Sequence, residues 1–338
     1  MPRATIKDVA KRANVSVATV SRVINGNYNV SPELSEKVMK VIKELDYYPN
    51  SVAQSLKKDA TYTIGFLVSN ISNNYFTSIA KMVEDEIKAH DYNLIVCSTE
   101  NNKDRELAYL KLLLSKKIDG LILNTTGMND DYISSISNYL PIVLINRRID
   151  HINFNGDFVD SDNVYGGYAL TKNLISLGHR KIGVINGSQI VSTGRERFEG
   201  FKKAMAEIGI SEDRLNLYRY DGNFDMESGY RGAAKLMESE ERPTAVVIMN
   251  NEMALGALRY FRSHEINIPD DISVTSYGDI INSDLIYVQL TVVSQNTDFV
   301  GKKIADLIVD RISKKNKVSN REIIYAPHMI NGTSVKKI

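Results

Sequence analysis

Apolar and polar residues follow two different patterns along the chain, and the change lies near residue 60. Before it, apolar residues recur at helical spacing in three short segments. After it, short apolar segments alternate with longer amphipathic segments, and the first four apolar segments read TIGFLV, NLIVCS, DGLILN and PIVLIN. Short apolar strands between amphipathic helices are typical of parallel sheets that helices cover on both faces. The pattern therefore predicts an α/β body behind a small helical segment.

The N-terminal segment predicts three helices. Thr5, followed by an acidic residue three positions later, has the spacing of a capping box for the first helix. Ser16 is a suitable N-cap for a second helix over residues 17–24, and Ser31 followed by proline begins a third helix that runs through Leu45. Two helices of about eight residues joined by a tight turn match a helix-turn-helix unit.

The body contains a second series of alternating elements. Further strands are expected at KIGVIN, LNLYRY, TAVVIM and DISVTSY, with amphipathic helices between them. One doubly wound domain rarely needs this many strands. We therefore expect two similar lobes, each with its own parallel sheet.

Charge is distributed unevenly, although the net charge of the whole chain is only +1. Residues 1–60 contain ten Lys and Arg against six Asp and Glu, a balance of +4, and the remainder contains 32 against 35, a balance of −3. A small basic module ahead of a slightly acidic body is typical of a phosphate-binding headpiece.

Composition and motifs narrow the class of protein. The 338 residues contain no apolar run of eighteen and no secretory signal pattern, so we expect a cytoplasmic protein with no membrane partner. The single cysteine, Cys97, lies in an apolar run and is expected to be a buried strand thiol. Nucleotide-binding glycine motifs, the G-x-S-x-G motif and a His pair at metal spacing are absent from the sequence. We therefore expect a binding protein rather than an enzyme, with no cofactor and no metal.

The opening segment can be compared with a known family. TIKDVAKRANVSVATVSRVING, followed by VSPELSEKVMKVIKELDYYPNSVAQSLKK, resembles the DNA-binding headpiece of the lactose/purine repressor (LacI/GalR) family of bacterial transcription regulators. The resemblance continues in IGFLVSN, SLGHRKIGVING, RERFEGF, NNEMALGALR and IPDDISVTSYGD, and so covers nearly the whole chain. VSVATVSRVING is close to the headpiece of the catabolite control branch.

The resemblance implies a domain organisation. It predicts a helix-turn-helix headpiece over residues 1–49 and a hinge helix and linker over 50–60. A two-lobed body similar to periplasmic binding proteins follows, with parallel sheets. We assign 61–160 with 292–320 to its N-terminal lobe, and 161–291 with 321–338 to its C-terminal lobe.

The second helix of the headpiece carries the residues expected to contact DNA bases. Val17 and Ala18 lie at its N-terminal end, where side chains meet base edges in the major groove, and Arg22 lies one turn further along. Arg22 suits bidentate bonding to guanine, whereas Val17 and Ala18 suit apolar contacts. The alternative places Val17 in the core, although four other apolar residues already form the inward stripe. Candidate phosphate contacts are Thr5, Lys7, Ser16, Thr19, Ser21 and Asn25.

Residues 50–57 form a helix too short to persist alone, because helix nucleation is costly. The resemblance implies that this hinge folds as a pair over the centre of the operator. It places Leu56 as a wedge in the minor groove beside the small Ala53, where wedging unstacks a base step and bends the duplex. The alternative is a plain linker.

Polar and aromatic side chains follow the strands of the body, where ligands bind in parallel α/β sheets. An aromatic platform with Arg, Asn and Asp suits a sugar or a heterocycle. The candidate effector-binding residues are Tyr75, Phe76, Asn146, Arg147, Thr193, Arg197, Phe224, Asn250 and Asp279. Many family members have Asp at the positions of Asn251 and Gly278, so the carboxylate that usually holds a hydroxyl pair is replaced by glycine here.

We expect a repressor of carbohydrate or related metabolic genes that binds a pseudo-palindromic operator as a homodimer. Its expected effector is a sugar or sugar-like molecule in the interlobe cleft. One alternative, taken from the catabolite control branch, replaces that effector with a phosphocarrier protein as co-regulator. A second alternative is a solute-binding protein without DNA function, which would need a signal sequence and no headpiece.

Overall fold

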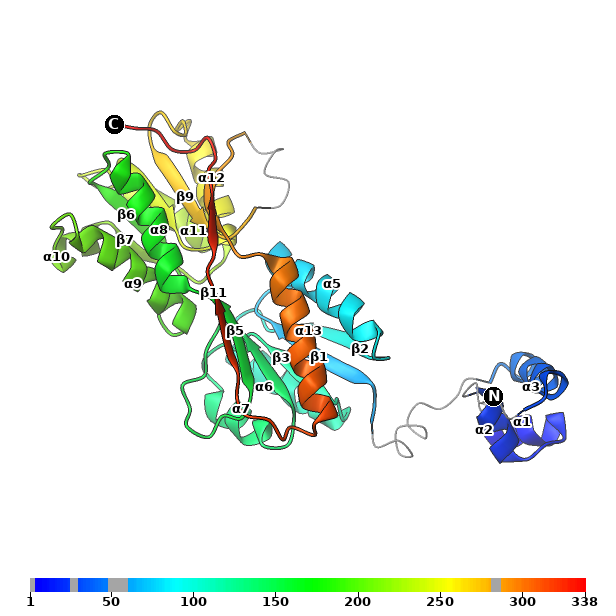
Figure 1. Cartoon of the computed structure of the whole chain (residues 1–338). Helices are drawn as coiled ribbons and strands as arrows, with labels where there is room; N and C mark the ends of the chain where they lie inside the picture. The colour runs from blue at the N-terminus through cyan, green and yellow to red at the C-terminus, as the bar shows by residue number, and fades with distance from the viewer. Residues whose placement is uncertain (1–3, 25–29, 48–59, 281–286) are drawn as a thin grey trace. The chain divides into compact units, whose positions relative to one another are not determined.

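The computed structural model describes residues 4–24, 30–47, 60–280 and 287–338. These residues form two compact units, Met1–Thr61 and Tyr62–Ile338 (Figure 1). The expected hinge residues Ala53 and Leu56 and the phosphate candidate Asn25 lie outside the described residues.

The first unit contains the three expected helices, α1 (Ile6–Ala13), α2 (Val17–Ile24) and α3 (Pro32–Glu44). The side chain of Asp8 accepts hydrogen bonds from the Thr5 backbone N–H and hydroxyl, which completes the capping box of α1. The small apolar core is formed by Val9, Ala10, Ala13, Val20, Val23, Val38, Val41 and Tyr47.

The first lobe of the second unit is built on a six-stranded sheet in which every neighbouring pair is parallel. Its strand order is β11-β5-β4-β3-β1-β2. The strands are β1 (Thr63–Val68), β2 (Asn93–Ser98), β3 (Gly120–Leu123), β4 (Ile142–Ile145), β5 (Asp157–Ser161) and β11 (Glu322–Tyr325). Apolar residues of α5 (Asn74–Lys88) and α13 (Thr297–Ser313) pack on one face of the sheet. The opposite face is covered by α6 (Lys103–Ser115) and α7 (Asp130–Ser137).

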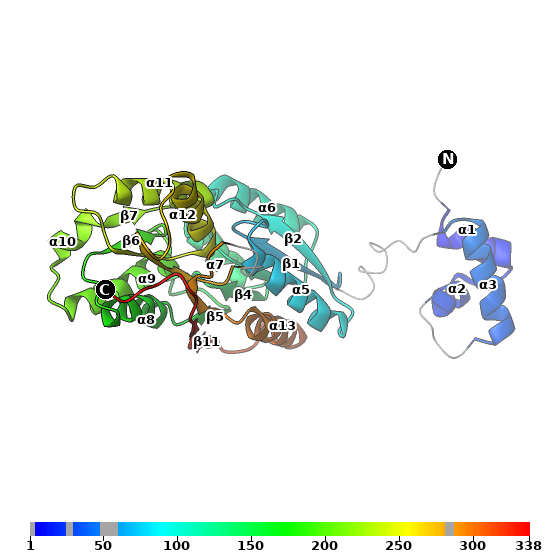
Figure 2. The ribbon, with the colours of Figure 1, turned by 90° about the horizontal axis from the view of Figure 1, so that it is seen from above.

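The second lobe repeats this arrangement with the order β12-β10-β9-β8-β6-β7, in which only β12 is antiparallel to its neighbour. The strands are β6 (Ile182–Asn186), β7 (Arg219–Asp221), β8 (Ala245–Ile248), β9 (Ser273–Tyr277), β10 (Thr291–Ser294) and β12 (His328–Ile330). Figure 2 shows helices on both sides of β6 and β7. One pair is α8 (Asn163–Ser176) and α9 (Ser192–Ala206), and the other is α11 (Met226–Met237) and α12 (Asn251–Ser263).

The structure moves the expected lobe boundaries near the C-terminus. The expectation placed 292–320 in the first lobe, where α13 does pack, but β10 pairs with β9 in the second sheet. It placed 321–338 in the second lobe, where β12 does pair, but β11 pairs with β5 in the first sheet. The chain therefore crosses between lobes after β5, after β10 and after β11. These late strands have only three or four residues each, too few for their sequence to specify a sheet.

Two local expectations were also wrong. The segment LNLYRY was expected to be a strand, but its first half ends α10 (Glu212–Leu217), and β7 begins only at Arg219. Leu215 is buried while Leu217 is exposed. The alternation of apolar and polar residues therefore belongs to a surface helix and not to a strand. Cys97 lies on β2 as expected but is only partly buried, because β2 is the edge strand of its sheet.

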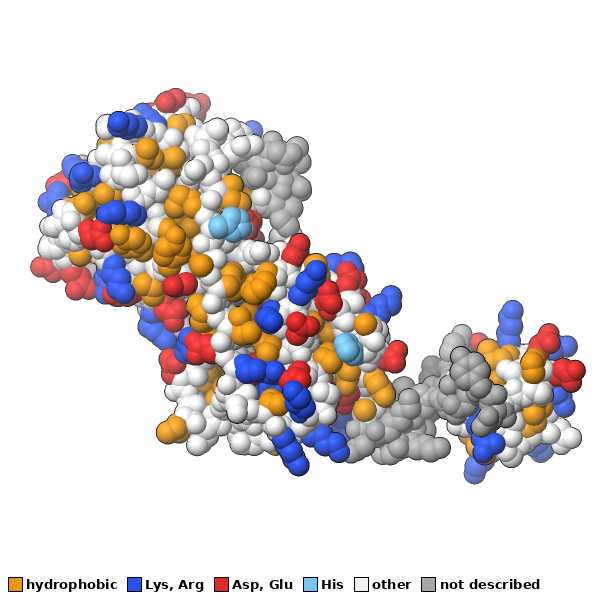
Figure 3. Space-filling model, in the orientation of Figure 1, with side chains coloured by type: hydrophobic (Ala, Val, Ile, Leu, Met, Phe, Trp, Pro, Cys, Tyr) orange, Lys and Arg blue, Asp and Glu red, His pale blue; other side chains and the backbone are white. Residues whose placement is uncertain are grey.

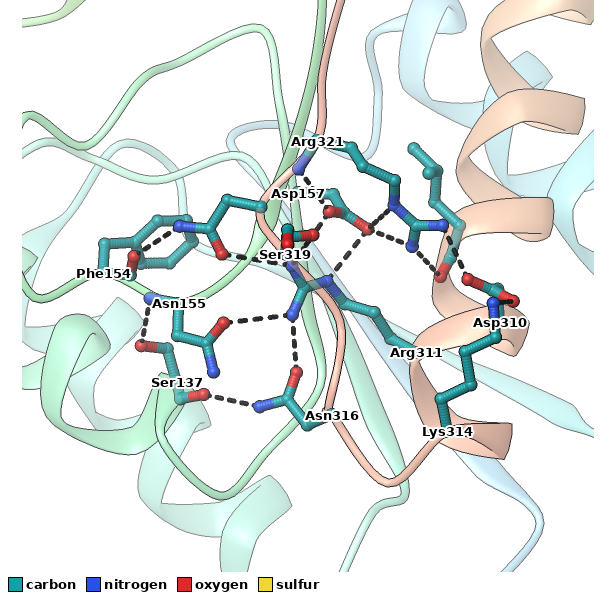
Figure 4. A network of polar contacts seen from close by, with 12 residues as sticks. Ser137, Phe154, Asn155, Asp157, Asp310, Arg311, Lys314, Asn316, Ser319 and Arg321 are labelled. Carbon is teal, nitrogen blue, oxygen red and sulfur yellow. Dashed lines mark hydrogen bonds and ion pairs between the residues drawn. The ribbon is translucent and has the colours of Figure 1, made fainter.

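A buried ion-pair network fastens the returning chain to the first sheet (Figure 4). Arg311 of α13 and Asp157 of β5 are both inaccessible to solvent, and their Nη2 and Oδ1 atoms lie 2.9 Å apart. Arg321, just before β11, donates to the same carboxylate at 2.6 Å and to Asp310 at 2.6 Å. Asn316 also accepts a hydrogen bond from Arg311. One carboxylate therefore joins α13, β5 and the start of β11.

We expect Asp157→Ala to lower the free energy of unfolding by about 3–5 kcal/mol, because it leaves the Arg311 guanidinium buried without its counter-charge. Urea denaturation followed by circular dichroism measures this change. Lys81→Ala, which breaks the exposed Lys81–Asp85 pair, is the matched control and is expected to change little. Equal effects of the two substitutions would contradict the role assigned to the network.

Candidate functional site

The carboxyl ends of both sheets open onto a cleft between the two lobes. A pocket of about 150 Å³ in this cleft is lined by residues from both lobes. Eight of the nine expected effector-binding residues line it: Tyr75, Phe76, Asn146, Arg147, Thr193, Arg197, Phe224 and Asn250. The ninth, Asp279, does not line this pocket but an adjoining cavity.

Tyr75 is held at the start of α5, in the first lobe. The side chain of Asn73 caps this helix by accepting from the Tyr75 backbone N–H at 2.9 Å. The Tyr75 hydroxyl donates to Asn146 Oδ1 at 2.7 Å, and its ring meets Phe76 edge-on with centroids 5.2 Å apart. Burial raises the pKa of Tyr75 far above its usual range, and the nearby Asp160 raises it further. Tyr75 is therefore a neutral, oriented wall of the pocket.

Arg147 follows β4 and is only 5% exposed. Its Nη1 donates to Asn101 Oδ1 at 2.8 Å and to the carbonyl oxygen of Thr125 at 2.9 Å. Its guanidinium also lies 5.4 Å from the centroid of the Phe224 ring, which belongs to the other lobe. Burial lowers the pKa of Arg147 to about 10, while the charge of Glu106 acts in the opposite direction. Arg147 thus remains a cation at neutral pH.

Arg197 lies on α9 in the second lobe and is 4% exposed. Its Nε donates to Asn163 Oδ1 at 2.9 Å, and its Nη1 donates to the carbonyl oxygen of Met249 at 2.7 Å. Its guanidinium stacks over the Tyr277 ring, 3.7 Å from the centroid. These three contacts fix the guanidinium against the wall of the pocket.

Four pocket residues have a left-handed backbone although none is glycine. Glu100 has φ of 53° and Asn101 has φ of 52°, while Asn146 has φ of 62° and Phe224 has φ of 64°. This conformation is uncommon for asparagine and an outlier for a bulky aromatic residue. The Phe224 ring packs against Gly187, where an added Cβ would lie 2.0 Å from the ring. Strained residues of this kind cluster at ligand sites, so the strain supports a binding role for Phe224.

A reciprocal amide pair closes the cleft across the two lobes. Asn73 Nδ2 donates to Asn251 Oδ1 at 3.1 Å, and Asn251 Nδ2 donates to Asn73 Oδ1 at 3.0 Å. Both side chains are buried. Asn250, the N-cap of α12, donates to the same Asn251 oxygen. The pair therefore joins the N-termini of α5 and α12, one from each lobe.

The remaining pocket residues were not among the candidates. They are Ser69, Asn70, Asn73, Glu100, Asn101, Asn124, Asp225, Asn251 and Gln295. Several of them closely follow β1, β2 or β3. The expectation that ligand-binding residues follow the ends of parallel strands therefore applies to them as well. Gln295 follows β10, a strand that the apolar pattern did not predict.

The structure places the three base-contact candidates on the outer side of α2. Val17 is 41% exposed, and Ala18 and Arg22 are also exposed, whereas Val20 and Val23 are buried. The outward position of Val17 disfavours its assignment to the core. α2 therefore presents a surface of two apolar side chains and one guanidinium.

Four of the phosphate candidates, Thr5, Lys7, Ser16 and Thr19, lie near the N-termini of the first two helices. Ser16 Oγ accepts from the Thr19 backbone N–H at 3.1 Å, as an N-cap does, and the two hydroxyls lie 2.9 Å apart. The Thr5 hydroxyl is engaged in its own capping box, and Lys7 is exposed. Ser21 is partly buried on α2.

The groups that line the pocket are suited to ligand binding. Amides, two guanidinium groups and aromatic rings give directional hydrogen bonds and flat apolar faces. No cluster of three or more His, Cys, Asp or Glu suited to a metal ion occurs in the described part of the chain.

The surface and the helices of the body add two further observations. On the face of the body seen in Figure 3, acidic and basic side chains are interspersed. Within the described ranges, no helix has both the length and the apolar character needed to cross a bilayer.

Comparison with known proteins gives the same two-part division. Residues 5–50 match the family of bacterial regulatory proteins, lacI family, and residues 61–331 match the periplasmic binding proteins and sugar binding domain of the LacI family. The HTH-type transcriptional repressor PurR of Haemophilus influenzae (strain PittEE) is 35% identical over 339 residues, with 99% of each chain covered. The repressor of that name from Edwardsiella ictaluri (strain 93-146) is 37% identical over 315 residues, with 92% of this chain and 91% of the relative covered.

Solved structures are similar over most or nearly all of the chain. A complex of the transcriptional regulator CelR with cellobiose is 27% identical, with a TM-score of 0.71 and coverage of 98% of this chain and 100% of that one. A LacI family regulator from Enterococcus faecium with bound ribose is 27% identical, with a TM-score of 0.73 and coverage of 82% and 99%. The lac repressor dimer bound to operator, 23% identical with a TM-score of 0.84 and coverage of 99% and 100%, shares the fold.

The amide pair between the lobes gives a testable coupling. We expect Asn73→Ala and Asn251→Ala each to lower the free energy of unfolding by about 1–3 kcal/mol, because each leaves a buried amide without its partner. The double variant is expected to lose clearly less than the sum, since the second substitution removes a group already unpaired. A double-mutant cycle in urea measures this, and strict additivity would show that the two amides do not interact in solution.

Proposed function

The chain belongs to the LacI family of bacterial regulatory proteins, and we propose that it is a transcriptional repressor that binds operator DNA through α2 and responds to a small ligand in the interlobe cleft. The observation that carries this proposal is the presence of both parts in one chain. An exposed, basic helix-turn-helix unit precedes a body whose polar pocket draws residues from two lobes. The full-length relatives with this organisation are repressors.

The headpiece is suited to reading a short sequence in the major groove. Arg22 offers the bidentate donor pair that recognises guanine, and Val17 and Ala18 offer apolar surface for a thymine methyl group. Thr5, Lys7, Ser16, Thr19 and Ser21 are proposed to contact phosphates and fix the orientation of the helix, with Asn25 beside them in the sequence. A two-fold dimer formed through the body would present two such helices to a pseudo-palindromic operator.

The cleft is suited to a sugar or sugar-like effector. Tyr75, Phe76 and Phe224 provide aromatic faces, and the amides and guanidinium groups provide directional bonds to hydroxyl or carbonyl oxygens. The hydrogen bonds to described residues use Nη1 of Arg147 and Nε and Nη1 of Arg197, so Nη2 of each guanidinium is proposed to donate to a ligand. The structural relatives with cellobiose and with ribose support this class of ligand.

Ligand control of DNA binding requires two arrangements of the lobes with different affinities for the ligand. Such coupling is typically about 1–3 kcal/mol in allosteric proteins. The hinge segment at residues 50–57, with Ala53 and Leu56, is proposed to transmit the change to the headpiece. The ligand acts as an inducer if it spreads the two hinges, and as a corepressor if it brings them together.

The other functions considered are less well supported. A solute-binding protein does not need the headpiece, and the curated relatives that span this chain are repressors. A phosphocarrier protein as co-regulator rests only on the headpiece resemblance. We propose that the protein is not an enzyme and acts in the cytoplasm, where its DNA is found.

The base-reading role of α2 can be tested by comparing two substitutions. We expect Arg22→Ala to weaken operator binding by about 1–3 kcal/mol and binding to random DNA only slightly. Lys7→Ala is the matched control and is expected to weaken both alike, because a phosphate contact carries no sequence information. An operator selected from a random library and fluorescence anisotropy at fixed salt give both affinities. Equal loss on operator and random DNA for Arg22→Ala would refute base reading by this residue.

A further inference from the structure

A second cavity adjoins the pocket in the cleft. Its volume is about 360 Å³, and its own lining includes Ser78, Gly278, Asp279, Ser294, Thr297 and Asp298. Tyr75, Asn251 and Gln295 line both spaces, so the two are separated only by these shared side chains. A ligand that occupies both spaces must therefore extend past Tyr75, Asn251 and Gln295.

The two volumes indicate that the cleft pocket is not the whole site. Pockets that bury a small molecule usually measure about 300–1,000 Å³. The cleft pocket, at about 150 Å³, is smaller than this range. The adjoining cavity, at about 360 Å³, lies within it. The larger share of the available space is therefore outside the pocket that the strand ends define.

Gly278 keeps the second cavity open. Its φ is +89°, a conformation that residues with a side chain rarely adopt. A Cβ at this position would meet Gln295 Oε1 at 3.4 Å and Asn251 at 3.6 Å. No described protein atom lies closer than 3.4 Å to this Cβ position, so the space beside Gly278 is accessible to a ligand.

The polar groups of this cavity suit an uncharged ligand with several hydroxyl groups. Gln295 is 5% exposed, and its Nε2 has no hydrogen-bond partner among the described residues. Such a buried donor is costly unless a ligand oxygen accepts from it. Asp279 Oδ2 accepts from Ser294 Oγ at 2.7 Å and from the Gln295 backbone N–H at 3.3 Å. A carboxylate has about four acceptor positions, so it can accept hydroxyl donors as well.

The charges of the cavity disfavour a phosphate group. Asp279 and Asp298 both line it, and its described lining contains His328 but no Lys or Arg. Two carboxylates repel a phosphate, whereas they accept hydrogen bonds from neutral hydroxyl groups. The chemistry selects a neutral polyhydroxylated ring over a sugar phosphate.

We propose that this cavity is a second subsite of the effector site and holds a neutral polyhydroxylated ring joined to the group bound in the cleft. The inference rests on the proposed function, because it assumes that the cleft binds the effector. A disaccharide and a nucleoside both have this two-part chemistry. In either case the ring hydroxyls donate to Asp279, and a ring or hydroxyl oxygen accepts from Gln295 Nε2.

Isothermal titration calorimetry of the full chain with matched ligand pairs tests the proposal. The pairs are cellobiose with glucose, and adenosine with adenine. We expect the two-ring member of one pair to bind about tenfold or more tightly than its one-ring partner. The pair that shows the difference identifies a disaccharide or a nucleoside as the ligand class.

Two substitutions on α5 separate the subsite from the rest of the cleft. Ser78 lines the second cavity only, and Ser78→Leu is expected to weaken the two-ring ligand about tenfold and leave the one-ring ligand unchanged. Thr77 is exposed and lines neither space, so Thr77→Leu is the matched control and should change neither affinity.

Three results would overturn the subsite. They are equal affinities within both pairs, the absence of binding by all four compounds, and an unchanged affinity for the two-ring ligand in Ser78→Leu. One-ring ligands that bind wild type as tightly as their two-ring partners would leave the proposed ligand control intact while removing the subsite. The proposed function itself would fail if the wild-type protein bound no operator sequence more tightly than random DNA, which is measured separately.

Discussion

In a parallel sheet all strands end at the same edge, and in this body the carboxyl edges of two such sheets open onto one cleft. Side chains that are far apart in the sequence, such as Tyr75, Arg147 and Phe224, therefore line a pocket of about 150 Å³. Central strands such as β1, β4 and β6 are almost entirely buried, so they fix the positions of the polar residues that follow them. The binding chemistry depends on this arrangement more than on any single contact.

The second constraint is that the chain passes between the lobes three times. Each crossing ties the lobes together, and the Asp157 network anchors the returning segment to the first sheet. Between the lobes, the contacts include the neutral amide pair of Asn73 and Asn251, the cation–π contact of Arg147 with Phe224, and the exposed ion pair of Arg195 with Asp150. Neutral hydrogen bonds contribute about 1 kcal/mol each, so a ligand of modest affinity can rearrange them. A body with a well-packed core in each lobe and weak contacts between the lobes is suited to a change of lobe arrangement when a ligand binds.

Much of this architecture could be predicted from the sequence. The start of α2 followed from a capping serine before it, and the central strands followed from continuous apolar runs. Eight effector candidates were placed in the pocket because strand ends are recognisable without knowledge of the tertiary structure. The base-contact candidates were on the exposed side of their helix because helical spacing separates the two faces.

Other features could not be predicted, for identifiable physical reasons. The segment containing Leu217 has strand-like alternation, but the residues before it favour a helix start, and tertiary packing of Leu215 decides between them. The short strands β10 and β11 have no sequence signal for the sheet that each one joins. The position of Asp279 in the adjoining cavity and the pairing of Asn73 with Asn251 depend on how the lobes meet.

The central claim is that the arrangement of the two lobes controls operator affinity. It can be tested without knowing the ligand, by replacing Asn73 and Asn251 with cysteine in a Cys97→Ser background and joining them with a short cleavable cross-linker. Fluorescence anisotropy then gives operator affinity before cross-linking, after it, and after cleavage. The account predicts a reversible change of about fivefold or more, the lower end of typical allosteric coupling. An operator affinity that is the same in all three states would contradict it.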